Sequence, residues 1–128
     1  MQKFLFDTHT LIWLAEQPEK LSTTSISVLN SNNELLLSHA SVWEMAVKIK
    51  TGKLKLKMLL EEFITKAAEK HKLNFLPILL THIYQTQILP FHHRDPFDRL
   101  LIAQAITENI AIISSDEIFD AYNSNRIW

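Results

Sequence analysis

The stretch HHRDPFDRLLIAQA, residues 92–105, places two aspartates at the start of an apolar helical pattern. Asp95 precedes Pro96, and an Asp followed by a Pro is typical of an N-cap followed by the first helical residue. We therefore predict a helix over 96–108 that Asp95 caps with its carboxylate. Asp98 lies one turn later, with its side chain leaning back toward the helix start, so Asp98 is the candidate for chemistry.

Short apolar segments alternate with helical patterns along the rest of the chain. The sequence predicts strands at residues 3–6, 34–38, 74–79 and 110–115, with a small edge strand at 126–128. It predicts helices at 8–17, 22–30 (capped by Ser22), 41–50, 58–71, 81 to near 90, and 96–108, with one or two helical turns at 117–122. This alternation predicts one α/β domain over residues 1–128, with a central, mainly parallel sheet flanked by helices.

Composition excludes several classes of protein. The chain has 128 residues and carries 13 Lys plus Arg against 14 Asp plus Glu, whereas a protein that only coats nucleic acid is usually strongly basic. It has no cysteine, so disulfides, thiolate zinc sites and a Cys nucleophile are excluded. Its single glycine, Gly52, excludes a Walker loop and is predicted to follow a helix C-cap. With no signal-peptide pattern and no membrane-spanning apolar run, we expect a cytoplasmic protein without membrane contact.

Four acidic residues lie where the pattern does not place them on an obvious solvated face. Asp7 and Asp116 directly follow predicted strands, Glu44 lies within SVWEMAV, and Asp98 lies within PFDRLLIA. Ligands of parallel sheets bind beyond the carboxyl ends of the strands. Each acid is flanked by apolar residues, and burying an unpaired carboxylate costs several kcal/mol. A divalent cation such as Mg²⁺ or Mn²⁺, which prefers oxygen ligands, would compensate all four charges together.

Each acid also has a simpler structural explanation. Asp7 or Asp116 could cap a helix that follows its strand, and Glu44 could point to water. Asp98 could be the acid of a capping box at a positive helix end. All four together indicate a shared metal site more strongly than any one of them does.

The residues that frame these acids resemble those of the PIN-domain ribonucleases, and in particular the VapC-like toxins of prokaryotic toxin–antitoxin pairs. The likeness covers essentially the whole chain, with the acids in order and at the expected spacing. It includes Glu44 in SVWEMAVK and Asp116 in SSDEIFDAY. The run H-x-D-P-F-D-R-x-L-x-A-Q-A at 93–105 is its most specific part, and Ser114 stands where the family often has Thr.

The resemblance implies a compact α/β fold and Mg²⁺- or Mn²⁺-dependent cleavage of RNA. The acidic quartet of the family corresponds here to Asp7, Glu44, Asp98 and Asp116. The resemblance also implies a cognate antitoxin that binds over the site and inhibits it. Homodimerisation is common in the family.

Hydrolysis of a phosphodiester needs a nucleophilic water and a positive charge that offsets the charge of the phosphate. A bound metal ion supplies both. We expect Asp7 and Asp98 to bind metal directly, and Asp116 to bind a second metal or hold a metal-bound water. Glu44 is expected to bind metal or to orient the attacking water. No covalent enzyme intermediate is expected.

Residues beside the acids give four candidate contacts to substrate: Thr8, Ser114, Lys48 and Arg99. Thr8 and Ser114 could instead satisfy nearby backbone groups, and Lys48 could simply pair with Glu44 one turn away. Arg99 could pair with Asp95. The RNA backbone could also be attracted by a run of lysines, at Lys48, Lys50, Lys53, Lys55 and Lys57.

Two other functions stay open. A haloacid-dehalogenase-like phosphotransferase would need D-x-D after the first strand, and here the third place is His9. A non-catalytic or regulatory metal-binding domain that binds RNA or a protein partner would be favoured by loss of an acid, yet all four are present. His92 and His93 are not expected to form a metal pair, and His93 is expected to hold the loop before the helix.

Overall fold

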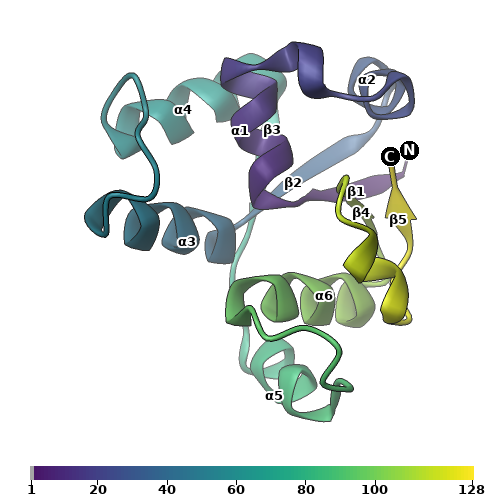
Figure 1. Ribbon diagram of the computed structural model, residues 1–128. Helices are drawn as coiled ribbons and strands as arrows, with labels where there is room; N and C mark the ends of the chain where they lie inside the picture. Colours follow the sequence, from purple (N-terminus) through teal and green to yellow (C-terminus); the bar gives the residue numbers. More distant parts are fainter. Residues whose placement is uncertain (1) are drawn as a thin grey trace.

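A computed structural model describes residues 2–128 of the chain. Within them, five parallel strands form one sheet in the order β3-β2-β1-β4-β5 (Figure 1). The strands are β1 (Lys3–Phe6), β2 (Glu34–Ser38), β3 (Leu73–Leu76), β4 (Ala111–Ile113) and β5 (Arg126–Ile127). The α/β class and the parallel sheet agree with the prediction. No helix in this part of the chain combines the length and the apolar character that crossing a membrane requires.

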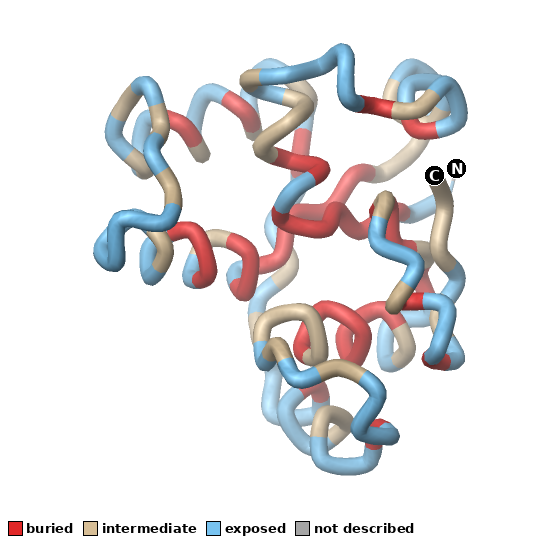
Figure 2. The backbone as a smooth tube through the Cα atoms, viewed as in Figure 1, coloured by how far each residue is buried: buried red, intermediate tan, exposed pale blue. Residues whose placement is uncertain are grey.

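Helices cover both faces of the sheet. One layer holds α1 (Thr8–Glu16), α2 (Thr23–Asn30), α3 (His39–Lys50) and α4 (Leu60–His71), with the short 3-10 helix η1 (Pro18–Lys20) after α1. The other layer holds α5 (Leu80–Ile88), α6 (Pro96–Glu108) and the 3-10 helix η2 (Glu117–Ala121). Figure 2 shows the buried residues gathered along the strands and on the sides of the helices that face them.

Alternation along the strands divides the core into two halves. Leu5 of β1 packs with the buried face of α6, whereas its neighbours Phe4 and Phe6 pack with α1, α3 and α4. Successive side chains of a strand point to opposite faces of its sheet. A strand covered on both faces therefore needs an unbroken apolar run, which is why KFLF is recognisable in the sequence.

Some predicted boundaries were wrong by a few residues. The third strand was predicted at 74–79 but ends at Leu76. Pro77 follows it, has no N–H to donate to a neighbouring strand, and its carbonyl accepts a hydrogen bond from Gln104 instead. The third helix begins at His39 rather than 41, because the hydroxyl of Ser38 accepts from the N–H of Ala40 and caps the helix.

The one glycine has the predicted role. Gly52 directly follows the C-cap residue Thr51 of α3 and has a φ of +77°. A glycine occupies this left-handed region without the steric cost that a side chain brings. The chain then leaves α3 with the N–H of Lys53 donating to the carbonyl of Lys48 at 2.8 Å.

The carboxyl ends of three strands carry polar side chains to one edge of the sheet. β1 leads into Asp7, β2 ends at Ser38, and β4 leads into Ser114. The N–H of Asp7 donates to the carbonyl of Ile113 at 3.1 Å, which continues the pairing of β1 with β4 to this edge. The candidate residues Asp7 and Ser114 are therefore brought together at this edge.

Asp95 caps α6 as predicted. Its Oδ1 accepts hydrogen bonds from the N–H groups of Phe97 at 2.8 Å and Asp98 at 3.1 Å, and Pro96 occupies the first helical position. Two otherwise unpaired N–H groups of the first turn are thereby satisfied. This confirms the structural assignment of Asp95.

Replacing Asp95 with Ala is expected to lower the free energy of unfolding by roughly 0.5–2 kcal/mol, because the cap is lost. Asp95→Asn and Asp95→Ser should restore most of that stability, since both side chains also accept from first-turn N–H groups. Denaturant melts of the three variants check this. A loss in Asp95→Asn as large as that in Asp95→Ala would show that the charge, and not the cap, stabilises the helix.

Candidate active site

Asp7 is held by hydrogen bonds at the end of β1. It is 4% exposed, and its Oδ1 accepts from the N–H of His9 at 2.6 Å, so Asp7 is the N-cap of α1. Its Oδ2 accepts from the hydroxyl of Ser114 at the end of β4. The same hydroxyl accepts from the N–H of Asp116 at 3.0 Å. Ser114 thus links the two aspartates that follow neighbouring strands.

Glu44 points inward from α3 and is only 2% exposed. Its Oε1 accepts from the hydroxyl of Thr8 at 2.7 Å, and its Oε2 lies 2.6 Å from the Nζ of Lys48. The hydroxyl of Thr8 also lies 2.9 Å from that of Ser41. Glu44 is therefore a buried, paired carboxylate rather than a solvated one, and Lys48 forms the i,i+4 ion pair that the sequence left open.

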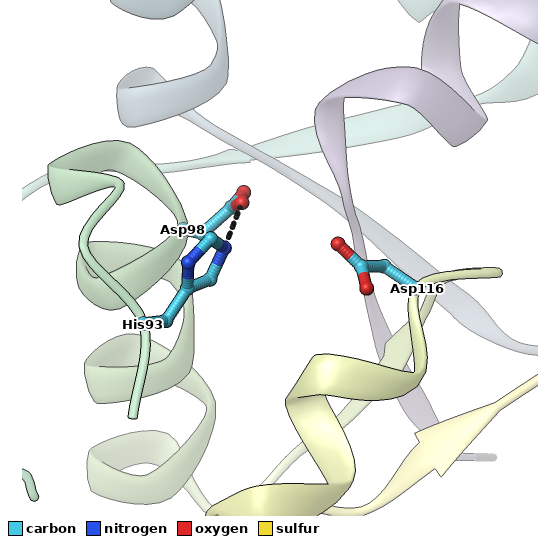
Figure 3. Close-up of side chains that lie close together, drawn as sticks. All are labelled: His93, Asp98 and Asp116. Carbon is cyan, nitrogen blue, oxygen red and sulfur yellow. Dashed lines mark hydrogen bonds and ion pairs between the residues drawn. The ribbon is translucent and has the colours of Figure 1, made fainter. Parts of the chain in front are cut away.

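Asp98 and Asp116 face one another across the site. The Nε2 of His93 lies 2.7 Å from Oδ2 of Asp98, and one ligand atom from each of His93, Asp98 and Asp116 lies within 4.8 Å of the others (Figure 3). Asp116 is exposed and caps η2, with its Oδ1 accepting from the N–H of Ile118 at 3.1 Å. These three side chains come from the loop before α6, from α6, and from the end of β4.

The electrostatics of the site disfavour ionised carboxylates. Burial raises the pKa of Asp98 to about 6, with further increases from the negative charges of Asp95, Asp7 and Glu44, while the hydrogen bond from His93 opposes the shift. Burial also raises the pKa of Asp7, against the opposing effect of its hydrogen bonds. The acids therefore lie close enough to repel one another, and burial is the larger cause of the shift.

Lys48 is a cation that lies among the acids of the site. Partial burial lowers its pKa, but its hydrogen bond to Glu44 and the negative charge of Glu44 raise it above the usual value overall. The charges of Asp95 and Asp98 add to this increase. Lys48 therefore lies among several acids and offsets part of their repulsion.

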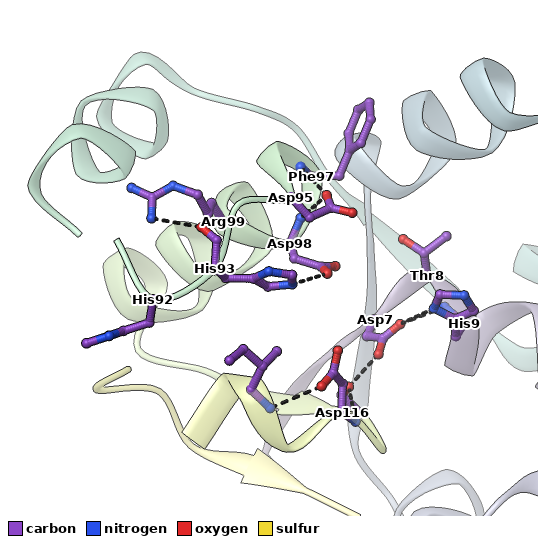
Figure 4. Close-up of polar contacts among 12 residues, drawn as sticks. Asp7, Thr8, His9, His92, His93, Asp95, Phe97, Asp98, Arg99 and Asp116 are labelled. Carbon is purple, nitrogen blue, oxygen red and sulfur yellow. Dashed lines mark hydrogen bonds and ion pairs between the residues drawn. The ribbon is translucent and has the colours of Figure 1, made fainter. Parts of the chain in front are cut away.

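The arrangement of the acids differs in part from our expectation. Figure 4 shows Asp7, Asp98 and Asp116 around a common space. Among the described residues, however, the group with ligand atoms within 4.8 Å contains Asp98 and Asp116 with His93, and not Asp7. Asp7 and Asp116 each cap a helix, so the simpler structural explanation holds for both, and their chemical role stays a prediction.

Arg99 binds backbone carbonyls in this structure, and its contact with substrate stays a prediction. Its guanidinium donates to the backbone carbonyls of Thr86 at 2.8 Å and Pro90 at 3.0 Å, and lies 5.0 Å from the ring centre of Phe91. Figure 4 shows it directed away from Asp7 and Asp116. Its N–H groups donate to backbone carbonyls, so Arg99 holds the segment between α5 and α6 in place. Few of its N–H groups are then available to bind a phosphate.

Thr8 and Ser114 are buried, and each hydroxyl contacts an acid at this edge of the sheet. Each hydroxyl is directed to a carboxylate, that of Thr8 to Glu44 and that of Ser114 to Asp7. The alternative that the sequence left open, a contact with nearby backbone groups, also holds for Ser114, whose hydroxyl accepts from the N–H of Asp116. The two side chains therefore fix acids at this edge of the sheet.

His93 is the residue whose contact sequence reasoning missed. We expected it to hold the loop before the helix, which its N–H does by donating to the hydroxyl of Tyr122 at 2.7 Å. Its ring additionally reaches Asp98. The available signal was its place at the start of the 93–105 run, five residues before Asp98. The ring of His92 packs edge-on against that of Tyr122.

The donor set fits a hard divalent cation. It consists of carboxylate oxygens with one imidazole nitrogen, and no thiolate exists in the chain. Mg²⁺ and Mn²⁺ prefer such oxygen ligands. A carboxyl group whose pKa is raised to about 6 is costly to ionise, and a bound cation would stabilise its ionised form.

Comparison with known proteins adds a family and a fold. A family model described as "PIN domain" matches residues 4–125. No curated protein matches the chain significantly. Several solved structures match the chain, and their sequence identities are low enough that they show a shared fold only.

One is VapBC2 from Rickettsia felis bound to a DNA fragment from its promoter, with a TM-score of 0.76, 14% identity and 98% of each chain covered. Another is DNA-bound VapBC from Salmonella typhimurium, with a TM-score of 0.68, 16% identity, and 100% of this chain and 98% of that chain covered. A third is VapBC-1 from nontypeable Haemophilus influenzae, with a TM-score of 0.64, 16% identity, and 98% of this chain and 97% of that chain covered.

The raised pKa of Asp98 predicts how stability of the metal-free protein depends on pH. A carboxyl whose pKa is raised on folding, here from 3.8 to about 6, destabilises the folded state where it is ionised. Asp98→Asn should therefore be more stable than the wild type above pH 6. The difference should shrink as the pH falls through 6 and vanish near 4. Thermal melts in EDTA across this range test it, and a difference independent of pH would contradict it.

Proposed function

Because this chain belongs to the PIN-domain family, we propose that it is a metal-dependent ribonuclease and the toxin of a toxin–antitoxin pair. The observation that carries the proposal is the convergence of acids at the carboxyl edge of the sheet. Asp98 and Asp116 approach each other there, and the pKa of Asp98 is raised first by burial, then by the charge of Asp95, and less by those of Asp7 and Glu44. A purely structural site would gain nothing from such repulsion.

Mg²⁺ or Mn²⁺ is the proposed cofactor, held by Asp7, Asp98 and Asp116. When bound, such a cation lowers the pKa of a coordinated water and neutralises charge on the phosphate. The ionised form of these three acids would be stabilised in return, which would offset the cost of burying Asp7 and Asp98.

The residues of the chain prepare this site before substrate arrives. Ser114 fixes Oδ2 of Asp7, and His93 fixes Oδ2 of Asp98, so both acids are oriented without further loss of side-chain freedom. Thr8 and Lys48 each bind one oxygen of Glu44.

Glu44 is the proposed orienting group for the attacking water. Carboxylate oxygens have further lone pairs beyond those that Thr8 and Lys48 use, so Glu44 can still accept a hydrogen bond from that water. The water would then attack phosphorus directly, in line with the leaving oxygen. The side chains named here offer no Ser–His–Asp arrangement for a covalent intermediate.

RNA is the proposed substrate, and a cognate antitoxin and a second copy of the chain are the proposed protein partners. The antitoxin is supported by the similarity to VapBC structures and by the residues that resemble VapC-like toxins. Action in the cytoplasm is consistent with a chain that has no cysteine. Lys48 is paired with Glu44, so attraction of the RNA backbone would depend on the other lysines of the run.

The second candidate function is a non-catalytic or regulatory domain that uses the metal site to bind RNA or a protein. The observation that favours it is structural. Asp7 and Asp116 both cap helices, so their presence alone does not require catalysis. A cleavage assay separates the two functions.

Purified protein free of any partner is expected to cleave RNA with Mg²⁺ or Mn²⁺, and to stop on addition of EDTA. Asp98→Asn should abolish cleavage, because the amide lacks the charge that a cation needs. Asp95→Asn is the matched control: it makes the same change three residues away, keeps the cap, and should leave cleavage largely intact. Rates are measured on total cellular RNA at saturating metal.

Three outcomes would count against this account. Full cleavage in EDTA would reject the metal mechanism. Loss of cleavage in Asp95→Asn with retention in Asp98→Asn would reverse the roles of the two aspartates. Binding of RNA with metal but no cleavage by the wild type would favour the non-catalytic domain.

A further inference from the structure

Three aromatic rings lie side by side on α1 and at the end of β5, and we call them the aromatic surface: His9, Trp13 and Trp128. The ring centres of His9 and Trp13 are 6.2 Å apart, and those of Trp13 and Trp128 are 5.9 Å apart. The Nζ of Lys20 lies 5.5 Å from the ring centre of Trp13. The three rings and this cation therefore form one continuous group.

The aromatic surface is partly open to solvent. The side chain of His9 is 61% exposed, and both tryptophans are half-buried. Within residues 2–128, Trp13 belongs to neither half of the core, although Ile12 and Leu14 on either side of it pack against one half. The helix thus directs a large aromatic side chain away from the core, which leaves ring area that a flat ligand can cover.

Both ends of the aromatic surface adjoin Asp7. The N–H of His9 donates to Oδ1 of Asp7 at 2.6 Å, and the ring Nδ1 of His9 lies 3.9 Å from the same oxygen (Figure 4). At the other end, the carbonyl of Ile127, directly before Trp128, accepts from the N–H of Ser114 at 3.1 Å. The hydroxyl of Ser114 in turn donates to Asp7. An RNA strand with one phosphate at the acids therefore has these rings beside a neighbouring nucleotide.

We propose that the aromatic surface binds a base of the RNA strand, in the nucleotide next to the phosphate that is cleaved. The proposal rests on the ribonuclease function proposed above. Its physical basis is that the acids repel an RNA backbone, and that the chain as a whole has a formal net charge of −1. Affinity for RNA must then come largely from contacts other than charge, and stacking of bases on aromatic side chains, histidine included, supplies such contacts.

Lys20 makes the aromatic surface a match for a nucleotide, which joins a flat base to a phosphate. Its side chain is exposed, and no carboxylate in the described part of the chain forms an ion pair with it. Lys48, in contrast, is paired with Glu44. The charge of Lys20 is therefore available to a phosphate beside the stacked base. A protein that covered these rings would have to supply an acid for Lys20 or bury its charge unpaired.

The first test measures binding of a short, unstructured, fluorescein-labelled RNA in Mg²⁺ to the Asp98→Asn protein, which should not cut it. His9→Gln on this background is expected to raise the Kd about five- to a hundred-fold, the range for removal of one stacked base. His9→Phe should retain most of the affinity, because it keeps an aromatic ring and lacks only the ring nitrogens. Phe75→Ala is the matched control: Phe75 is an exposed aromatic residue on β3, at the opposite edge of the sheet, and its loss should leave the Kd unchanged.

Tryptophan fluorescence gives a second readout that does not depend on a loss of affinity. A base stacked on an indole ring quenches the fluorescence of that ring, and two of the three tryptophans of the chain belong to the aromatic surface. Unlabelled RNA is expected to quench the emission of the Asp98→Asn protein. Quenching should persist when Trp43→Phe is added. It should be largely lost when Trp13→Phe and Trp128→Phe are added together, since phenyl rings keep the surface apolar but only Trp43 then emits.

Each other outcome overturns the inference in a distinguishable way. An unchanged Kd in His9→Gln, with quenching that is lost in Trp43→Phe, rejects the aromatic surface while RNA cleavage by the wild type still supports the proposed function. Equal losses of affinity in His9→Gln and His9→Phe replace stacking by a polar contact of the imidazole.

Two further results separate the remaining possibilities. A change from dimer to monomer by light scattering in the Trp13→Phe, Trp128→Phe protein, with RNA affinity unchanged, assigns the surface to a second copy of the chain. Absence of both binding and quenching in the Asp98→Asn protein rejects the aromatic surface alone if the wild type cleaves RNA, and rejects both proposals if it does not.

Discussion

Repulsion among buried carboxylates is the constraint on which the rest of the site depends. Asp7 and Glu44 are almost fully buried, and Asp98 is largely so. Without compensation such charges would favour unfolding or protonation. The chain supplies partial compensation through neutral hydroxyl donors, one lysine and one histidine, and the raised pKa of Asp98 shows that this compensation is incomplete. The charge that is left uncompensated is what the proposed cation would neutralise.

The two helical layers are tied together on the same side of the sheet by buried polar contacts. Ser38, which caps α3, donates its hydroxyl hydrogen to Oε1 of Gln104 on α6 at 2.5 Å. The Nε2 of Gln104 lies 3.4 Å from Nδ1 of His82, which also accepts from the N–H of Leu79 at the start of α5. The other ring nitrogen of His82 lies 3.1 Å from Glu108. This chain of contacts fixes α3, which carries Glu44, relative to α6, which carries Asp98.

Local rules explain what the sequence predicted well. The strands β1 and β2 agree with prediction because apolar runs of this length, covered on both faces, have few other structures open to them. The cap of α6 agrees because Asp95 and Pro96 act on their own helix only. The acids were located because carboxylates in apolar surroundings require an explanation, although their ligand roles remain a prediction.

Contacts between distant segments explain what the sequence did not predict. The reach of His93 to Asp98 depends on the path of an irregular loop, and the use of Arg99 as a clamp depends on carbonyls of α5 and the loop after it. The hydrogen bond from Ser114 to Asp7 depends on the pairing of β1 with β4. None of these follows from spacing along the chain, because each is set by packing of elements that are separate in the sequence.

The most direct measurement of the central claim is the change in melting temperature on adding Mg²⁺ or Mn²⁺ at neutral pH. A ligand that binds only the folded state stabilises it in proportion to the logarithm of its concentration over Kd. The account predicts a clear increase for the wild type, a similar increase for Asp95→Asn, and a much smaller one for Asp98→Asn. Equal increases in all three proteins, or none in the wild type, would contradict the claim that these acids converge to hold a cation.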